Sequence, residues 1–323
     1  MSFVNTPYDD VFRTLLNDCS SLIIPLINEV FGEHYTGKER IVFSQNEHFM
    51  NRQDGNEEER ITDTGFKIIT ETESKKYHWE CQSSGDSSML VRFFEYDTQI
   101  ALDEGEIKKN VLTVTLPNSA VLFLRCDGGT PDQMKIEIVT PGGTVSYAIP
   151  VMKSQQYSID DIFERGLLFL IPFHIFSYES RFEEYENDRD KLMELQGEYK
   201  DIADRIEQML NAGDISEYTK CTILDMSDKV LKHIARKYVN VREGVKDVMG
   251  GRVLDYEAKR IKNEGVREGR AEGREEGRAE GIVETGIDFG LSDNEILEKL
   301  QIKLNISLQM AQEYFLKYGK KTV

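Results

Sequence analysis

The character of the sequence changes near residue 180, and this change limits most strongly what the chain can fold into. Before it, apolar and polar residues alternate in short runs separated by Gly and Pro, which is typical of strands joined by turns. After it, the sequence is highly charged, free of Pro and periodic at helical spacing. With 323 residues, 39% of them hydrophobic, the chain can bury one sizeable core and form a second region. We therefore predict an α/β domain followed by an all-helical C-terminal region.

The first 180 residues contain helical and extended patterns in a mixed order. Helical spacing from Tyr8 to Phe31 is interrupted near Ser20, Ser21 and Pro25, so it predicts one broken helix or two. A strand meander is predicted next, with Ser74-Lys75-Lys76 as its last turn and extended segments near residues 41–49, 61–70 and 77–82. Residues 89–102 keep a helical period. Further strands are expected at 120–126, 135–139 and 145–151, the last two joined by a Pro141-Gly142-Gly143 turn.

The remaining residues predict helices near 181–210, 216–238 and 251–284, and a terminal helix pair within 292–318. We therefore divide the chain into an α/β domain (1–180), a helical accessory region (181–250) and a glycine-repeat helix with the terminal pair (251–323). In the third region a glycine recurs at every fourth position, at Gly265, Gly269, Gly273, Gly277 and Gly281. Each glycine costs about 1 kcal/mol in a helix relative to Ala. Two explanations stay open: close approach of helices in a homo-oligomer, or a flexible solvated spacer.

Charge and cysteine content restrict the function classes. The net charge is −18, and residues 1–180 hold 28 acidic against 15 basic residues, so a broad basic face for nucleic acid is not expected there. A DNA-binding protein of this composition would need a local basic cluster, a divalent metal or a second region. The four cysteines have no Cys-x-x-Cys spacing, which argues against a disulfide framework or a zinc site.

No leader-like segment opens the sequence, and the most apolar run, residues 166–176, has about half of the roughly 20 residues that a membrane span needs. We therefore expect a cytoplasmic protein with no membrane partner.

The clearest chemical pattern is Tyr77-His78-Trp79-Glu80-Cys81-Gln82. In a strand, His78, Glu80 and Gln82 share one face, and the apolar residues between them share the other. Asp63 stands near the start of the preceding strand, where a hairpin can bring it beside Glu80. Two converging carboxylates suit Mg²⁺ or Mn²⁺, which would polarise a scissile phosphate and lower the pKa of an attacking water. The competing explanation is that these acids are ordinary residues of a solvated sheet face.

At these residues the chain resembles the PD-(D/E)XK nuclease family transposases, also called the recombination-promoting nuclease (Rpn) family. The matching segments span nearly the whole chain: Asp9 to Leu16, Arg60 to Asp63, His78 to Gln82, Arg92 to Tyr96, Leu170 to Phe173 and the Glu-Gly repeats of the tail. The resemblance implies a restriction-endonuclease-like αβββαβ core with a mixed sheet, and phosphodiester hydrolysis in DNA. It assigns the two metal-binding acids to Asp63 and Glu80, and a backbone carbonyl ligand to Cys81. Gln82 stands where many members of the wider superfamily have Lys.

Several further residues are candidates for the same site. Because an amide at Gln82 can only orient water by hydrogen bonding, Lys67, which has the strand parity of Asp63, is a candidate surrogate cation. Arg92 and Tyr96 share a helix face and would contact a phosphate, support Glu80, or simply pack helix against sheet. His78 shares the face of Glu80 and would touch substrate or a metal-bound water, or only be hydrogen-bonded. As in some superfamily members, Glu29 or Glu47 would supply a further acid.

The main hypothesis is a Mg²⁺-dependent endodeoxyribonuclease linked to recombination or mobile-element activity. Asp63 and Glu80 would bind the metal, and Gln82 would orient the attacking water. A rival of another class is a catalytically silent protein of the same fold that acts as an assembly or interaction module through its helical tail. A third is a nuclease for RNA or structured DNA, since a fold does not determine its substrate.

Overall fold

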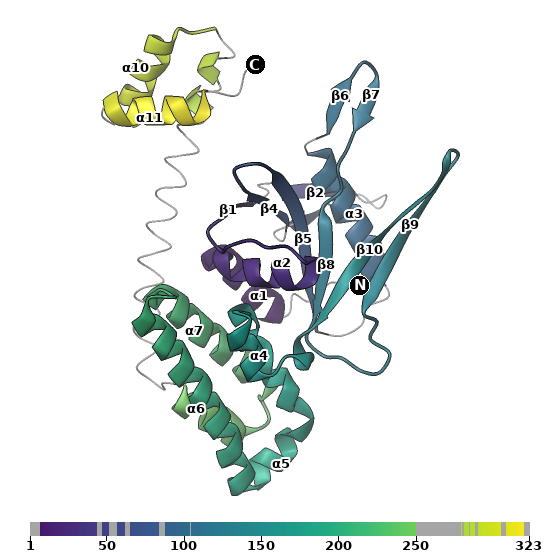
Figure 1. Ribbon diagram of the computed structural model, residues 1–323, viewed down its shortest axis with the longest axis vertical. Helices are drawn as coiled ribbons and strands as arrows, with labels where there is room; N and C mark the ends of the chain where they lie inside the picture. Colours follow the sequence, from purple (N-terminus) through teal and green to yellow (C-terminus); the bar gives the residue numbers. More distant parts are fainter. Residues whose placement is uncertain are drawn as a thin grey trace. The chain divides into compact units, whose positions relative to one another are not determined.

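The computed structural model describes residues 7–43, 47–51, 57–61, 65–83, 88–103, 105–249, 279, 281–283, 285–287, 290–304 and 308–319. The chain forms two compact units, residues 1–255 and 256–323. The first is mixed α/β, with a six-stranded mixed sheet in the N-terminal half followed by a largely helical region (Figure 1). No helix of the described residues is long and apolar enough to cross a membrane.

The N-terminal segment folds as two helices, as its interrupted pattern predicts. A short 3-10 helix, η1 (Ser20–Leu22), separates α1 (Pro7–Asp18) from α2 (Ile23–Phe31). Pro25 lies in the first turn of α2, where its missing N–H is not needed for a helical hydrogen bond. Gly32 ends α2 at a φ of 65°, a left-handed conformation that costs glycine no steric penalty.

The main sheet combines antiparallel and parallel pairing in the order β1-β4-β5-β8-β10-β9. Three antiparallel strands form its first half: β1 (Arg40–Phe43), β4 (Gly65–Ile69) and β5 (Ser74–Gln82). β8 (Asn118–Phe123) then pairs parallel to β5 on one side and parallel to β10 (Gly143–Lys153) on the other. β9 (Gln133–Thr140) closes the edge antiparallel to β10. The predicted Pro141-Gly142-Gly143 turn joins β9 and β10, with Gly143 at a φ of 140°.

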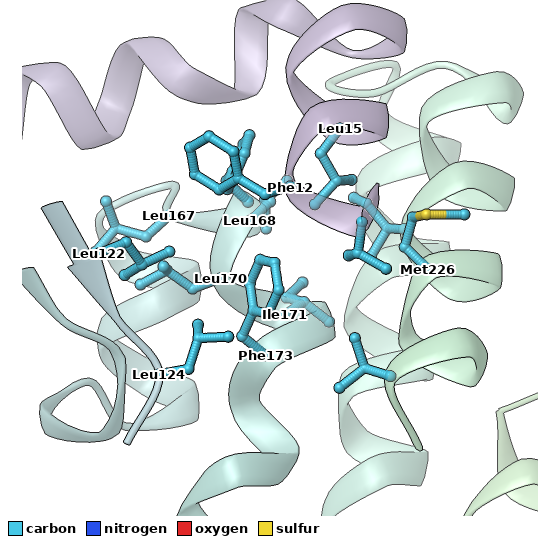
Figure 2. Close-up of a cluster of buried hydrophobic side chains, with 14 of the residues drawn as sticks. Phe12, Leu15, Leu122, Leu124, Leu167, Leu168, Leu170, Ile171, Phe173 and Met226 are labelled. Carbon is cyan, nitrogen blue, oxygen red and sulfur yellow. The ribbon is translucent and has the colours of Figure 1, made fainter. Parts of the chain in front are cut away.

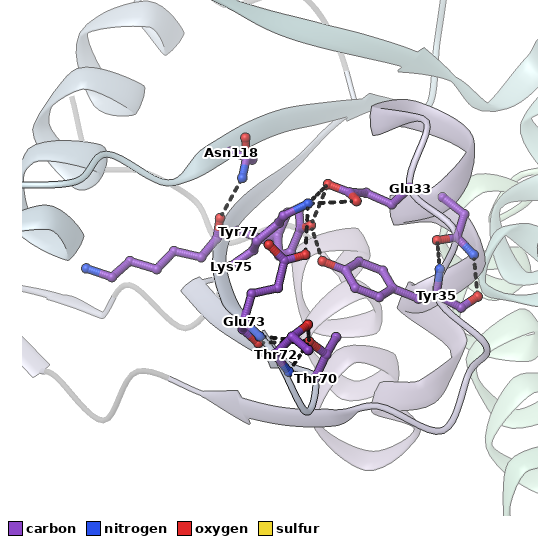
Figure 3. Close-up of polar contacts among 10 residues, drawn as sticks. Glu33, Tyr35, Thr70, Thr72, Glu73, Lys75, Tyr77 and Asn118 are labelled. Atoms are coloured by element: carbon purple, nitrogen blue, oxygen red, sulfur yellow. Dashed lines mark hydrogen bonds and ion pairs between the residues drawn. The ribbon is translucent and has the colours of Figure 1, made fainter.

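The turn predicted at Ser74-Lys75-Lys76 was wrong, because these residues already belong to β5. The chain reverses at Thr70–Glu73 instead, where the Thr70 amide donates to the Glu73 carbonyl over 2.9 Å. The Thr70 hydroxyl oxygen also accepts from the Thr72 and Glu73 amides, so side-chain hydrogen bonds make this turn (Figure 3). Lys75, expected in the turn, is instead a strand residue whose ammonium donates to Glu33 over 2.8 Å.

Two further hairpins lie outside the main sheet. β2 (Glu47–Asn51) pairs with β3 (Glu57–Ile61). β2 begins inside the extended segment predicted at 41–49, whereas β3 lies almost entirely before the segment predicted at 61–70. β6 (Glu106–Lys108) pairs with β7 (Val111–Thr113), and no strand was predicted there. All six residues of β6 and β7 are exposed, so they carry no apolar alternation by which a half-buried strand is recognised.

Helices cover both faces of the sheet. Tyr77, Trp79 and Cys81 of β5 are buried in the core that contains α1 and α2. The intervening residues face α3 (Met89–Leu102), whose bounds match the predicted helix, and a smaller core of β8, β9 and β10 side chains lies on that side. The alternation predicted for β5 is therefore confirmed, with one face in the apolar core and a polar row on the other.

A continuous core joins the sheet to the helices that follow it. The long 3-10 helix η3 (Leu168–Arg181) buries nine consecutive side chains, residues 168–176, and also Tyr178. The Phe169 ring lies 5.1 Å from the Phe12 ring of α1. α7 (Glu217–Ile234) packs against both α1 and η3 and contributes Met226 (Figure 2). The remaining helices of this unit are η2 (Ser154–Gln156), α4 (Ile159–Glu164), α5 (Phe182–Asn187), α6 (Arg189–Ala212) and α8 (Val239–Val248). The predicted boundary at residues 180 and 181 thus falls inside a single packed core.

The second unit contains the predicted terminal helix pair, α10 (Asp293–Leu304) and α11 (Leu308–Tyr318). Ala279, Val283, Ile296, Leu300 and Ala311 form its own small apolar core. Four of the five repeat glycines, Gly265, Gly269, Gly273 and Gly277, lie outside the described residues.

Truncation tests whether residues 1–180 can fold alone. A chain ending at residue 180 lacks α7 and therefore exposes the apolar faces of α1 and η3. We expect it to lose cooperative unfolding, whereas a chain ending at residue 255 keeps it because the whole first unit is present. Scanning calorimetry with near-ultraviolet circular dichroism measures both. A sharp transition in the shorter chain at the temperature of the longer one would contradict the single core.

Candidate active site around Glu80 and His78

The candidate site lies on the face of β5 that α3 covers. His78 and Glu80 occupy this face near the C-terminal end of the strand, two residues apart. His78 is fully buried, whereas the Glu80 side chain is 17% exposed. The two side chains touch, because His78 Nε2 lies 3.3 Å from Glu80 Oε1. Of these two side chains, Glu80 therefore reaches toward solvent while His78 is fully enclosed.

A buried carboxylate holds the other side of the His78 ring. Asp97 of α3 is fully buried, and its Oδ1 lies 2.7 Å from His78 Nδ1. The same carboxylate accepts hydrogen bonds from Ser119 Oγ at 2.6 Å and from the Tyr147 hydroxyl at 2.8 Å. Four elements, β5, α3, β8 and β10, thus meet at one side chain. Both of its oxygens are satisfied, as a buried charge requires.

Aromatic rings enclose His78 on the helix side. The Phe93 ring lies 5.1 Å from the imidazole, and the Tyr96 ring lies 5.8 Å away at a near-perpendicular angle. Tyr96 was a predicted site residue, and the structure places it beside His78. Since aromatic pairs favour such edge-on geometry, the rings limit the orientations that the imidazole can adopt.

These contacts set the charge states of the pair. Burial lowers the pKa of His78, but the hydrogen bonds and charges of Asp97 and Glu80 outweigh burial and raise it to about 9. Burial likewise raises the pKa of Glu80, but the hydrogen bond and charge of His78 and the charges of Arg92 and Arg13 bring it below its usual value. At neutral pH the site therefore contains a protonated His78 imidazolium beside an ionised Glu80.

Two arginines supply positive charge near Glu80 from opposite layers of the fold. Arg92 belongs to α3 and Arg13 to α1, which contacts β5. Arg92 was among the predicted candidates, whereas Arg13 was not. Its position in the sequence segment Asp9 to Leu16, which carries part of the family resemblance, was the signal that could have identified it.

Two further predicted site residues, Gln82 and Cys81, lie on opposite faces of β5. Gln82 ends β5 half-buried, and its backbone carbonyl accepts from the Leu124 amide at 2.9 Å. The Cys81 thiol is buried on the opposite face, among the core residues of α1 and α2, and burial raises its pKa. A neutral thiol on that face cannot be a ligand beside Glu80, which leaves the backbone carbonyl as the group that the resemblance implies.

Lys67 and Glu29 are not brought together with Glu80. Lys67 of β4 pairs with Lys76, four residues before Glu80 on β5, so it lies roughly 13 Å along the strand from Glu80. The Glu29 carboxylate is 2.7 Å from Arg165 Nη1 and accepts from the Tyr157 hydroxyl at 3.4 Å, among helices of the other layer. Neither position favours the role expected for it.

Two predicted acids fall outside the described atoms. Asp63 lies in the segment 62–64, beyond the described residues, and for Glu47 the structure describes only the backbone, paired with Ile61. Within the described part of the chain, no three His, Cys, Asp or Glu side chains are grouped so as to hold a metal ion.

Sequence reasoning missed Asp97, Ser119 and Tyr147. A signal for Asp97 was present, because it occupies the buried stripe of α3 that also includes Phe93, Ile100 and Ala101. An acid in the apolar stripe of a helix needs a partner, so its position indicates a buried polar network. Ser119 and Tyr147 gave no such signal, since their role depends on β8 and β10 coming together in the sheet.

The raised pKa of His78 predicts a pH-dependent stability. The folded form binds a proton that the unfolded form, with a pKa near 6.5, releases first, so the stabilisation is complete below pH 6.5 and is lost as the pH rises through about 9. We expect a loss of about 3 kcal/mol across this range. Urea unfolding of the wild type and His78→Gln at several pH values measures it, with imidazole NMR reporting the proton directly. Parallel pH profiles for the two proteins would contradict the prediction.

No family model, no curated protein and no solved structure matches the chain. Its function has to be inferred from its own residues.

Proposed function

We propose that the protein is a metal-dependent DNA endonuclease in which Glu80 is a ligand of Mg²⁺ or Mn²⁺. One observation carries the proposal: an ionised, partly exposed carboxylate stands near the C-terminal end of a central strand, with arginine charges beside it from two different helices. Such a carboxylate is a hard oxygen donor, the type of ligand that Mg²⁺ prefers. Glu80 therefore fits the ion, although one carboxylate is not a complete site.

The order of the elements supports a nuclease-like core. Helices α1 and α2 are followed by the antiparallel strands β1, β4 and β5, then by α3 and by β8, which runs parallel to β5. Within the main sheet, and leaving aside the β2-β3 and β6-β7 hairpins, this order is compatible with the αβββαβ restriction-endonuclease-like core that the sequence resemblance implies. The helical region after the sheet takes the place of the accessory helices.

The second ligand of the proposed site is Asp63. The observed register pairs Gly65 of β4 with His78 of β5. Asp63 precedes Gly65 by two residues in the sequence and Glu80 follows His78 by two, so both acids are equally distant in sequence from one observed strand pair. The family resemblance assigns both of them to the metal ion.

The metal ion and four residues would each have a separate role in the proposed phosphodiester hydrolysis. A bound divalent ion would polarise a phosphate oxygen and lower the pKa of an attacking water. Gln82, two residues after Glu80 and of the same strand parity, would orient this water through its amide, and the Cys81 carbonyl would be a further ligand of the ion. Arg92 and Arg13 place positive charge where the scissile phosphate gains negative charge.

The acidic composition of the chain makes these local charges important. Because the chain has a net charge of −18, the protein as a whole repels DNA. Its affinity for DNA therefore has to come from the bound ion, Arg13 and Arg92. We therefore expect weak, salt-sensitive binding of DNA. The resemblance further points to recombination or mobile-element activity as the setting.

Cleavage of supercoiled plasmid with Mg²⁺ or Mn²⁺ tests the proposal. Glu80→Gln and Asp63→Asn each remove a ligand charge, and we expect each to lower the nicking rate roughly a thousandfold, because metal stabilisation is worth several kcal/mol. Glu71→Gln is the matched control, since Glu71 is exposed in the turn between β4 and β5. Equal nicking by all four proteins would identify a contaminant. No nicking by any would favour the alternative, a silent assembly module.

The arginine charges predict a second kinetic effect. Arg13→Gln and Arg92→Gln should each raise the KM for DNA about tenfold and reduce the slope of log KM against log salt by about one, as expected for loss of one phosphate contact. Arg189→Gln, at an exposed position that begins α6, is the control. An unchanged salt slope in both variants would show that these arginines do not meet DNA.

A further inference from the structure

The proposed chemistry gives no role to the buried hydrogen-bond network of Asp97, His78, Ser119 and Tyr147. Asp97 is an acidic side chain with no exposed surface, and three hydrogen bonds involve its carboxyl oxygens. Burying a charge is costly, and a well-packed apolar group at such a position is often equally stable or more stable. Structural support alone is therefore an incomplete reason for a carboxylate under α3.

The hydrogen-bond network connects Asp97 to Glu80 through the His78 ring. Asp97 accepts from the Nδ1 side of the His78 ring, and the Nε2 side of the same ring faces Glu80 Oε1 at 3.3 Å. Each ring nitrogen of His78 therefore faces a carboxylate oxygen, one from Asp97 and one from Glu80. The imidazole is thus a rigid bridge whose orientation is determined at its buried end.

From this geometry we propose that Asp97 and His78 are positioning residues that hold the Glu80 carboxylate in one orientation for the metal ion. The inference rests on the proposed function of Glu80 as a metal ligand. Ser119 and Tyr147 act one step further away, since each donates to an oxygen of Asp97. Hydrogen bonds from outside a metal site to its ligands typically change affinity by about 10- to 100-fold.

The positions of the four residues explain why the arrangement is stiff. His78 and Ser119 are direct neighbours in the parallel pairing of β5 with β8, so the sheet itself sets their separation. Tyr147 belongs to β10, which pairs with β8 on the side opposite β5, and Asp97 belongs to α3, which covers this face of the sheet. Any rotation of the Asp97 carboxylate would break hydrogen bonds to three strands at once. His78 is the hydrogen-bond partner that connects the partly exposed Glu80 carboxylate to this network.

Mn²⁺ binding to the intact protein, measured without DNA by calorimetry and by electron paramagnetic resonance, tests the proposal. We expect Asp97→Asn to weaken Mn²⁺ binding by about 10- to 100-fold. Tyr147→Phe and Ser119→Ala, which each remove one hydrogen bond to Asp97, should weaken it severalfold. Asp103→Asn is the matched control, because it makes the same change at the exposed end of the same helix and should bind Mn²⁺ as the wild type does.

Thermal unfolding of the same proteins separates positioning from structural support. A purely structural role lowers the melting temperature and leaves the Mn²⁺ affinity of the folded protein unchanged, and that result would overturn the proposal. If Asp97→Asn does not fold, Tyr147→Phe and Ser119→Ala decide by the same criterion.

The plasmid assay distinguishes this inference from the proposed function. If the wild type binds Mn²⁺ through Glu80 but cuts no DNA, the proposed nuclease activity is refuted. The Mn²⁺ affinities of the variants relative to the wild type still test the positioning role in that case. Normal cutting with wild-type Mn²⁺ affinity in the Asp97, Tyr147 and Ser119 variants would keep the nuclease and refute the positioning. Wild-type protein that binds no Mn²⁺ would refute both.

Discussion

Burial of the Tyr77, Trp79 and Cys81 face of β5 is the constraint on which the rest of the structure depends. These side chains lie against α1 and α2 with almost no exposed surface, and Trp79 is the largest fully buried residue of the chain's described part. Because side chains alternate along a strand, this burial directs His78 and Glu80 to the opposite face. The candidate site is therefore a consequence of core packing. A shift of β5 by one residue would bury Glu80 in the apolar core and turn Trp79 toward α3.

The sequence was informative where a local pattern reports burial. The alternation in β5 and the stripe of α3 each reflect one face turned to the core, whereas the glycine turn after β9 reflects a backbone conformation that favours Gly, and the structure confirms all three. The turn after β4 was misplaced because Thr70 builds it through hydroxyl hydrogen bonds, whereas Ser74-Lys75-Lys76 merely resembled a polar loop. β6 and β7 were missed because both of their faces are exposed.

The candidate site could be predicted only in part, since its members come together through tertiary pairing. Glu80 and His78 are two residues apart, so strand parity alone places them on one face. Asp97, Ser119 and Tyr147 are 19 to 50 positions away from their hydrogen-bond partners, and only the sheet order β5-β8-β10 unites them. The charge of Arg13 reaches Glu80 because α1 packs on β5. Lys67 has the strand parity expected for the site but lies too far along the strand from Glu80. Parity predicts the face of the sheet on which a residue lies and not its position along the strand.

The contact of α7 with α1 has a consequence for how the protein forms during synthesis. α1 spans residues 7–18, and its partner α7 spans residues 217–234, so the apolar surface of α1 stays incompletely covered until more than two thirds of the chain has left the ribosome. Contacts this distant in sequence form late, because the intervening chain has to lose entropy first. Arg13 lies on α1, and its place beside Glu80 therefore becomes permanent only at that stage. A nascent chain that already contains the whole sheet would still hold an unfinished site, which delays any activity until the helical region has folded.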